Sequence, residues 1–170
     1  MERQKKFNEV LAENNSRIRS VCNYYFGNSD DARDAYQEAL IKIWLNIQNF
    51  RGESLMRTWV TRITLNVCLT HVSKNKRDNS LFRKIGDEEY SVRAEGADDD
   101  NEAEEKLKFF REFNSSLSST DRMLVALYLQ DIDYTEISEI TGLSSINART
   151  RIHRIKEKIR KEWEVKNGTR

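Results

Sequence analysis

The 170-residue chain contains no proline and only six glycines, and this restricts its folding more than any other feature. Average usage of about 5% would supply about eight prolines in a chain of this length. Because proline and glycine form most sharp turns, the sequence disfavours a fold of many short strands. Long helices with few connections fit better, and the sequence predicts an all-α fold.

The composition narrows the class of protein. Hydrophobic residues make up 38% and charged residues 34%, which is enough apolar material for one or two small helical cores. The longest apolar run, Met123 to Leu129, is far shorter than a membrane span, and residues 1–6 precede no signal-peptide hydrophobic stretch. Cys22 and Cys68 lack CxxC spacing. We therefore expect a reduced, cytoplasmic protein with no direct membrane insertion.

The net charge of +1 conceals three segments of different charge. Residues 1–77 contain 13 basic and 8 acidic side chains, residues 78–113 contain 6 and 12, and residues 114–170 contain 10 and 8. Two basic ends therefore flank an acidic middle. Within the last segment, residues 149–161 include seven basic side chains and one acidic one. Such asymmetry indicates nucleic-acid contacts at the two ends.

The acidic middle also predicts the domain organisation. Residues 87–105 contain ten acidic side chains and few large apolar ones, so they are expected to stay extended and solvated. We predict two small helical domains, at 1–80 and 107–165, joined by a flexible acidic linker at 81–106. The linker either serves as a plain tether or follows a basic channel on a partner, and both alternatives stay open.

Helical periodicity divides the first domain into three helices. The first runs from about Glu2 to Tyr25, and Gly27 follows it. Ser29 is placed to cap the second helix, which ends near Phe50, and Ser54 is placed to cap the third. The third helix has a basic end, which the helix dipole favours.

The second domain has four expected helices. Ser118 and Ser144 are placed as N-caps, and Asp133 with Glu136 forms a pattern like a capping box. Gly142 fits the left-handed position that ends a helix. The helices are expected at 104–113, at 121–130, from Asp133 to Thr141, and after Ser144.

The last two helices have the arrangement of a helix-turn-helix motif, in which the second helix enters the major groove. Ile152 and Ile155 fall on one side of this helix. The opposite side includes side chains able to read guanine edges or hold phosphates, namely Arg149, Thr150, His153 and Arg154. The alternative interpretation is a merely solvated basic helix.

Three segments resemble bacterial sigma factors. Residues 133–161, DYTEISEITGLSSINARTRIHRIKEKIRK, resemble region 4. Residues 30–44, DDARDAYQEALIKIW, resemble regions 2.1–2.2, and residues 49–69, NFRGESLMRTWVTRITLNVCL, resemble regions 2.3–2.4. Their order and the acidic linker are similar to the two-domain extracytoplasmic-function (ECF) group. The resemblance implies an alternative sigma factor that binds core RNA polymerase, recognises the −35 and −10 promoter elements and promotes DNA melting.

The resemblance also implies roles for individual residues. The contact with the polymerase clamp is expected at Asp34, Gln37, Glu38, Ile41 and Trp44. The pocket for a flipped base of the −10 element, with its loop and floor, is expected at Phe50, Arg51, Thr61, Ile63, Asn66 and Thr70. Phosphates of this element are assigned to Arg62, Lys74, Lys76 and Arg77. The −35 readers are expected at Asn147, Arg149, Thr150, Arg151, His153 and Arg154. An anti-sigma factor is a common partner in the family.

Some features leave alternatives open. Without the resemblance, Phe50 reads as a core residue and Asn66 as a solvent-facing one, and Trp44 and Trp59 are expected in the core. The family often has Gly-Thr-Val where Ile146-Asn147-Ala148 stands, so the −35 preference is open. Tyr36 also replaces a smaller apolar residue that is common in the family.

Two other classes of function fit the sequence less well. An enzyme is disfavoured because every glycine is isolated and His71 and His153 lack ligand partners at metal-binding spacing, so no catalytic residue, metal or cofactor is expected. A stand-alone helix-turn-helix repressor or activator explains the second domain, but it leaves residues 50–77 without a role. A repressor binds promoter DNA alone, whereas a sigma factor requires core polymerase.

Overall fold

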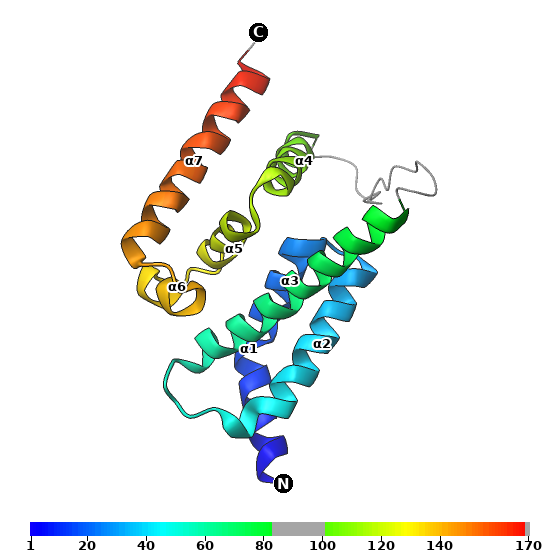
Figure 1. Cartoon of the computed structure of the whole chain (residues 1–170), viewed down its shortest axis with the longest axis vertical. Coiled ribbons are helices and arrows are strands. Elements are labelled where there is room, and N and C mark those ends of the chain that lie inside the picture. Colours follow the sequence, from blue (N-terminus) through cyan, green and yellow to red (C-terminus); the bar gives the residue numbers. More distant parts are fainter. Residues whose placement is uncertain (83–100, 169–170) are drawn as a thin grey trace.

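The protein is described by a computed structural model over residues 1–82 and 101–168, and its regular elements there are all helices (Figure 1). In chain order these are α1 (Glu2–Phe26), α2 (Asp30–Asn46), the 3-10 helix η1 (Ile47–Asn49), α3 (Met56–Phe82), α4 (Asn101–Ser116), α5 (Ser119–Tyr128), α6 (Tyr134–Thr141) and α7 (Ser145–Asn167). The described residues contain no strand, which confirms the all-α prediction. None of their helices is long and apolar enough to cross a membrane. The central part of the expected linker, 83–100, lies outside the described residues.

Helices α1, α2 and α3 form the N-terminal bundle. Its core contains Ile18 of α1, Ile43 of α2 and Val67 of α3, each at most 1% exposed. Ala35 and Ala39 are fully buried on α2, and their small side chains let the neighbouring helices approach closely.

The helix boundaries follow from local side chains in most places. The Ser29 hydroxyl accepts a hydrogen bond from the Ala32 N–H at 3.3 Å, so the predicted cap of α2 is confirmed. The prediction that Ser54 caps the third helix is wrong. The N–H of Trp59 donates to the carbonyl of Leu55 at 3.1 Å, so the helix starts after Leu55.

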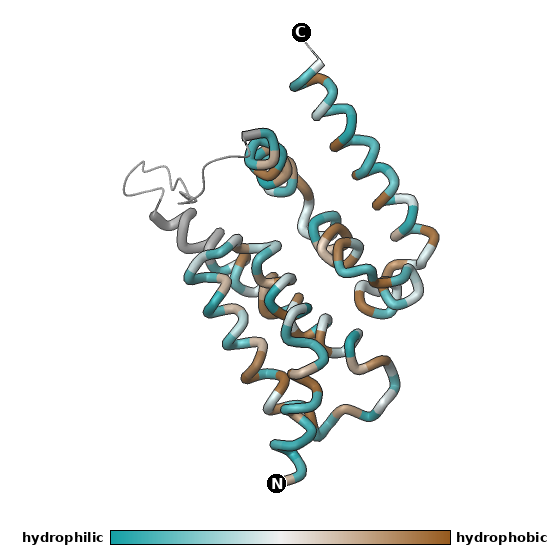
Figure 2. The backbone as a smooth tube through the Cα atoms, turned by 180° about the vertical axis from the view of Figure 1, so that it is seen from behind, coloured by the Kyte–Doolittle hydropathy of each residue, from teal (hydrophilic) through white to brown (hydrophobic). Residues whose placement is uncertain are grey.

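Helices α4 to α7 form the C-terminal domain, in which α6 and α7 make the helix-turn-helix. Ser118, Asp133 and Ser144 accept hydrogen bonds from the first turns of α5, α6 and α7, as predicted. Gly142 has φ of 75° and ends α6 in the left-handed conformation. Hydrophilic residues dominate α7, and hydrophobic ones recur singly along it (Figure 2).

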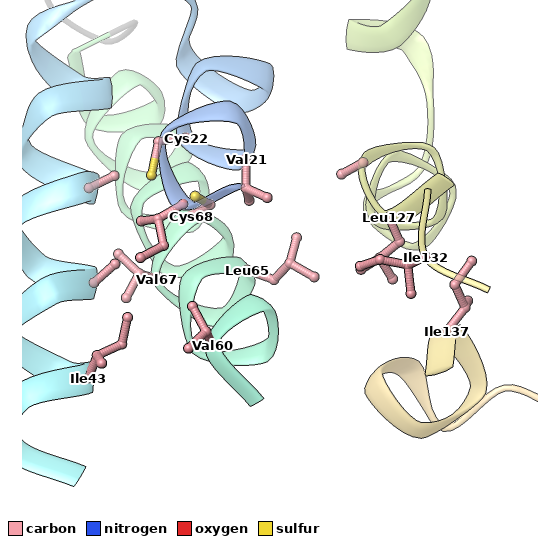
Figure 3. Close-up of a cluster of buried hydrophobic side chains, with 14 of the residues drawn as sticks. Val21, Cys22, Ile43, Val60, Leu65, Val67, Cys68, Leu127, Ile132 and Ile137 are labelled. Atoms are coloured by element: carbon pink, nitrogen blue, oxygen red, sulfur yellow. The ribbon is translucent and has the colours of Figure 1, made fainter. Parts of the chain in front are cut away.

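The two domains pack directly against each other. Val21 of α1 and Leu65 of α3, each 1% exposed, point towards Leu127 and Ile132 of the C-terminal domain (Figure 3). One cluster of buried apolar residues runs through both domains. The described residues therefore adopt a closed arrangement with a continuous hydrophobic core.

Candidate nucleic-acid interface

A hollow of about 370 Å³ lies between α2 and α3 in the N-terminal bundle. Its lining combines an aromatic ring, an aliphatic side chain, amides and an ammonium group, contributed by Lys42, Asn46, Asn49, Trp59, Ile63 and Asn66. Its volume falls at the small end of the range of about 300–1,000 Å³ that small-molecule sites occupy.

Helical spacing explains why these side chains meet. Trp59, Ile63 and Asn66 follow one another by four and three residues, so they share one face of α3. The lining residues from α2 and η1 have the same spacing and face them across the hollow. An aromatic face can stack on a base, and an amide can hydrogen-bond to a base edge. This lining is suited to holding one unpaired base.

Phe50 packs against Trp59, which lines the hollow. The two rings have centroids 5.4 Å apart and planes tilted by 58°, and Phe50 is half-buried. The Lys6 ammonium lies 5.9 Å from the Phe50 ring centroid. Arg51, the residue after Phe50, is exposed. Gly52 has φ of 75°, which turns the chain into the loop before α3.

Other residues assigned to this pocket lie elsewhere on α3. Thr61 is 1% exposed and donates its hydroxyl to the carbonyl of Arg57 at 2.7 Å. Thr70 is one turn beyond Asn66 and donates to its carbonyl at 2.7 Å. Arg62 donates to the carbonyl of Glu139 on α6. Of the residues predicted for the pocket, Ile63 and Asn66 line the hollow itself.

Four lining residues lie outside the set predicted for the pocket. One is Trp59, which was expected in the core and is half-buried. The other three, Lys42, Asn46 and Asn49, come from α2 and η1. Their common face is visible in the spacing of the sequence. What the sequence does not show is that this face of α2 opposes the face of α3 bearing Asn66, because that depends on how the two helices pack.

The predicted clamp residues divide between two sides of α2. Asp34, Gln37 and Ile41 are exposed along one stripe, and Leu45 extends it by one more turn. Ile41 and Leu45 are 57% and 59% exposed, which is unusual for neighbouring aliphatic side chains. The stripe is suited to a partner protein.

Glu38 and Trp44 point into the N-terminal bundle instead. The Glu38 carboxylate lies 2.9 Å from the Lys42 ammonium and 2.7 Å from Nε2 of His71. Hydrogen bonds from Lys42 and from His71 lower the pKa of Glu38 to about 2. Trp44 packs edge-on against Phe7, with centroids 5.2 Å apart.

The two faces of α7 separate as predicted. Ala148, Ile152 and Ile155 are buried against the domain. The residues on the other face, Asn147, Arg149, Thr150, His153 and Arg154, are all exposed. This arrangement leaves the basic face of the second helix of the helix-turn-helix open to a duplex.

Arg151 behaves differently from its neighbours. Its guanidinium donates to the Asp121 carboxylate at 2.9 Å and ties α7 to α5. Burial raises the pKa of Asp121, but the hydrogen bonds from Arg151 and Ser118 outweigh it, and the pKa ends below its ordinary value. Among the described residues, no group of three or more His, Cys, Asp or Glu side chains could hold a metal ion.

Family models match both domains of the chain. The Sigma-70 region 2 model matches residues 10–78, and the Sigma-70 region 4 model matches residues 112–159. The ECF RNA polymerase sigma factor SigW of Bacillus subtilis is 28% identical over 167 residues, covering 94% of this chain and 89% of SigW. The ECF sigma-E factor of Haemophilus influenzae is 27% identical, covering 92% and 86%. The chain belongs to the sigma-70 family and is a sigma factor of its ECF group.

Solved structures show the same fold. The sigma factor RpoE from Bartonella quintana, in complex with the anti-sigma factor NepR, superposes with a TM-score of 0.74 at 19% identity, covering 95% of this chain and 98% of that one. CnrH, in complex with the cytosolic domain of CnrY, gives 0.67 at 18% identity.

The chain is therefore an alternative sigma factor that acts in transcription initiation. Sigma factors bind core RNA polymerase and promoter DNA. They are regulatory initiation factors and, in general, not enzymes.

Proposed function

We propose that the two DNA surfaces of this sigma factor have separate tasks. The domain at 1–80 binds the polymerase clamp and the −10 element, the domain at 107–165 reads the −35 element as a duplex, and residues 81–106 link them. The observation that carries this proposal is the hollow between α2 and α3, because a duplex reader alone has no use for it.

The hollow takes one base flipped out of the −10 element. Flipping costs a few kcal/mol, and stacking with edge hydrogen bonds offsets this cost. Trp59, which packs against Phe50, supplies the aromatic surface, and Asn66 supplies the amide. Lys42 in the lining and the exposed Arg51 supply positive charge for the phosphates of the displaced strand.

Helix α7 reads the −35 element in the major groove. Arg149 and Arg154 suit guanine edges, and Asn147 suits an adenine edge. Thr150 and His153 complete this exposed face. Arg151 fixes the position of this helix, because its guanidinium holds α7 to Asp121 on α5.

The stripe on α2 docks on the clamp. Asp34 and Gln37 offer acceptors to a basic partner helix, and Ile41 with Leu45 supplies apolar contact. Glu38 and Trp44 hold α2 in place within its bundle.

Anti-sigma factors occupy both solved relatives, NepR on RpoE and the cytosolic domain of CnrY on CnrH. We propose a partner of the same class for this chain. Its place of action is the cytoplasm, where the polymerase is.

Run-off transcription tests the proposed function. Core polymerase is incubated with genomic promoter fragments, with and without the full chain, and the same fragments are used for gel shifts with the chain alone. We expect new, promoter-specific transcripts only when the chain is present. Strong promoter binding by the chain alone, with no transcript added, would contradict the proposal and favour a repressor.

A further inference from the structure

Ile146 lies in the first turn of α7 and is 77% exposed. Among the large hydrophobic side chains of the described residues, only Met1 at the start of the chain is more exposed. A single exposed aliphatic side chain is common on protein surfaces and has no function for that reason alone. The position of Ile146 on α7 distinguishes it from such a case.

Ile146 begins the face of α7 that is proposed to read DNA. Arg149, Thr150 and His153 follow it by three, four and seven residues, which places them with it on one stripe of the helix. Ala148 is fully buried and marks the opposite side. In a helix-turn-helix the N-terminal residues of the second helix contact base edges. The most exposed aliphatic side chain of α7 therefore lies at the end of the helix where base edges are read.

Hydrogen bonds in the first turns of α7 fix the surroundings of Ile146. The Ser144 hydroxyl accepts from the Asn147 N–H at 3.3 Å, and the Thr150 hydroxyl donates to the Ile146 carbonyl at 2.9 Å. Because its proton is used inside the helix, Thr150 has its methyl group to offer a base edge. Ile146 is β-branched, and a helical backbone leaves such a side chain one strongly preferred rotamer. The two residues thus present a stiff apolar surface.

The major groove offers an apolar side chain one partner. Base edges present ring-nitrogen and carbonyl acceptors, amino donors and, on thymine alone, a C5-methyl group. Isoleucine has neither a donor nor an acceptor, so against a polar edge it would displace water without replacing the lost hydrogen bonds. Against thymine it buries the methyl group and gains hydrophobic contact.

We infer that Ile146 determines part of the −35 preference of this sigma factor by contacting the C5-methyl group of a thymine. Thr150, one turn along on the same face, adds its own methyl group to the contact. The inference rests on the proposed function, because it takes α7 as the helix that reads the −35 duplex. Ile146 belongs to the three residues that replace the Gly-Thr-Val common in the family, so the contact distinguishes this chain within the family.

Deoxyuridine tests this contact, because it lacks the C5-methyl group of thymine and keeps the same hydrogen-bonding edge. The full chain in complex with core polymerase first selects its preferred duplexes from promoters randomised across the −35 element. The selected duplex is then remade with deoxyuridine in place of each thymine in turn, on both strands, and its affinity is measured by competition. We expect at least one thymine at which the replacement weakens binding about threefold to fivefold, the size that one buried methyl group gives.

Variants of Ile146 assign the effect to its side chain. Ile146→Ala should bind the thymine duplex about as weakly as wild type binds the deoxyuridine duplex, and it should no longer distinguish the two. Ile146→Val keeps a branched aliphatic side chain and should still distinguish them. The matched control is Val165→Ala, which shortens a 73% exposed side chain about 28 Å further along α7 and should keep the wild-type ratio. Each ratio compares two duplexes on one variant, so changes in folding or in polymerase binding cancel.

The thymine contact would be overturned if no deoxyuridine replacement weakened wild-type binding, if Ile146→Ala kept the wild-type ratio, or if Val165→Ala lost it. A selected element made of G·C pairs alone would overturn it as well. Failure of the proposed function gives a different result. In that case the selection yields no −35 preference of any kind, because α7 then reads no duplex, and the contact falls with it.

Discussion

On α7 the side chains proposed to contact DNA are exposed in the closed form. Helix α3, in contrast, is in contact with other helices on two of its sides. One side of α3 forms the open hollow with α2, and the other is covered by α6. Arg154 makes no ion pair among the described residues, but Arg57 is bound to Glu136. The surface proposed for the −35 element is therefore exposed in this arrangement, whereas one side of α3 is covered by α6.

The largest effect is expected from the covered side of α3. Leu65 is 1% exposed and points towards Leu127 in the other domain. Leu65→Ala should lower the free energy of unfolding by about 2–5 kcal/mol, because a buried leucine leaves a cavity. Urea unfolding measures the change.

The side of α3 that lines the hollow supplies the substitution for comparison with Leu65→Ala. Ile63 lines the hollow and is only half-buried, so Ile63→Ala should cost roughly 1 kcal/mol. Equal losses from Leu65→Ala and Ile63→Ala would show that the two sides of α3 are not as different as the closed form indicates.

The exposed stripe on α2 should affect binding and not stability. Ile41→Asp places a charge in an apolar contact, and we expect core polymerase binding to weaken by about 2 kcal/mol, or about thirtyfold. Because Ile41 is 57% exposed, the melting temperature should change little. Ile41→Val keeps the apolar contact and should bind nearly normally. Unchanged binding of Ile41→Asp would remove the stripe from the clamp interface.

Two arginines on α7 allow a side chain that contacts DNA to be distinguished from one that is only solvated. Arg154 is exposed without an ion pair among the described residues, whereas Arg160 lies 2.8 Å from the Glu157 carboxylate. Arg154→Ala should reduce the slope of log affinity against log salt by about 1 for a −35 duplex. Arg160→Ala should reduce it less. Fluorescence anisotropy of the full chain in complex with core polymerase, over a salt series, measures both slopes. Equal slopes for the two variants would mean that Arg154 contacts DNA phosphates no more than Arg160 does.

The smallest expected effect is on the pH dependence of the free energy of unfolding. The pKa of Glu38 is about 2 in the folded chain, below its ordinary value, so its carboxylate adds stability above about pH 5. That stability is lost as the pH falls towards 2. Because Glu38 is one-third exposed, Glu38→Gln should cost only about 0.5–1 kcal/mol at pH 7.

Urea unfolding between pH 3 and pH 7 should show the difference between wild type and Glu38→Gln shrinking as the pH falls. Glu9→Gln, an exposed change on α1, is the control. A difference that does not vary with pH would contradict the assignment of the low pKa to Glu38.

Much of this molecule could be predicted from short-range patterns. Ser29, Ser118 and Ser144 cap helices as predicted, since capping depends on residues within one turn. The buried Ile152 follows in the same way from helical periodicity. Ser54 failed as a cap because the loop after Gly52 continues one residue further, to Leu55.

Contacts between distant helices could not be predicted. Nothing near Glu136 in the sequence indicates that its carboxylate leaves α6 for Arg57, which is 79 residues away. Lys42 and Asn46 likewise joined the site only through the packing of α2 on α3. Such contacts depend on how whole helices are placed, which no local pattern encodes.

Permanganate footprinting of unpaired thymines tests the separation of tasks most directly, on matched promoters and on promoters mismatched across the −10 region. Asn66→Ala should bind promoters nearly normally but open matched duplexes slowly, and pre-melting should rescue it because the unpairing cost is removed. Arg154→Ala should weaken recruitment by about 1–3 kcal/mol and should not be rescued. Asn8→Ala and Arg160→Ala are the matched controls. If both Asn66→Ala and Arg154→Ala impaired only the initial binding, or if pre-melting rescued both equally, the two surfaces would not have separate tasks.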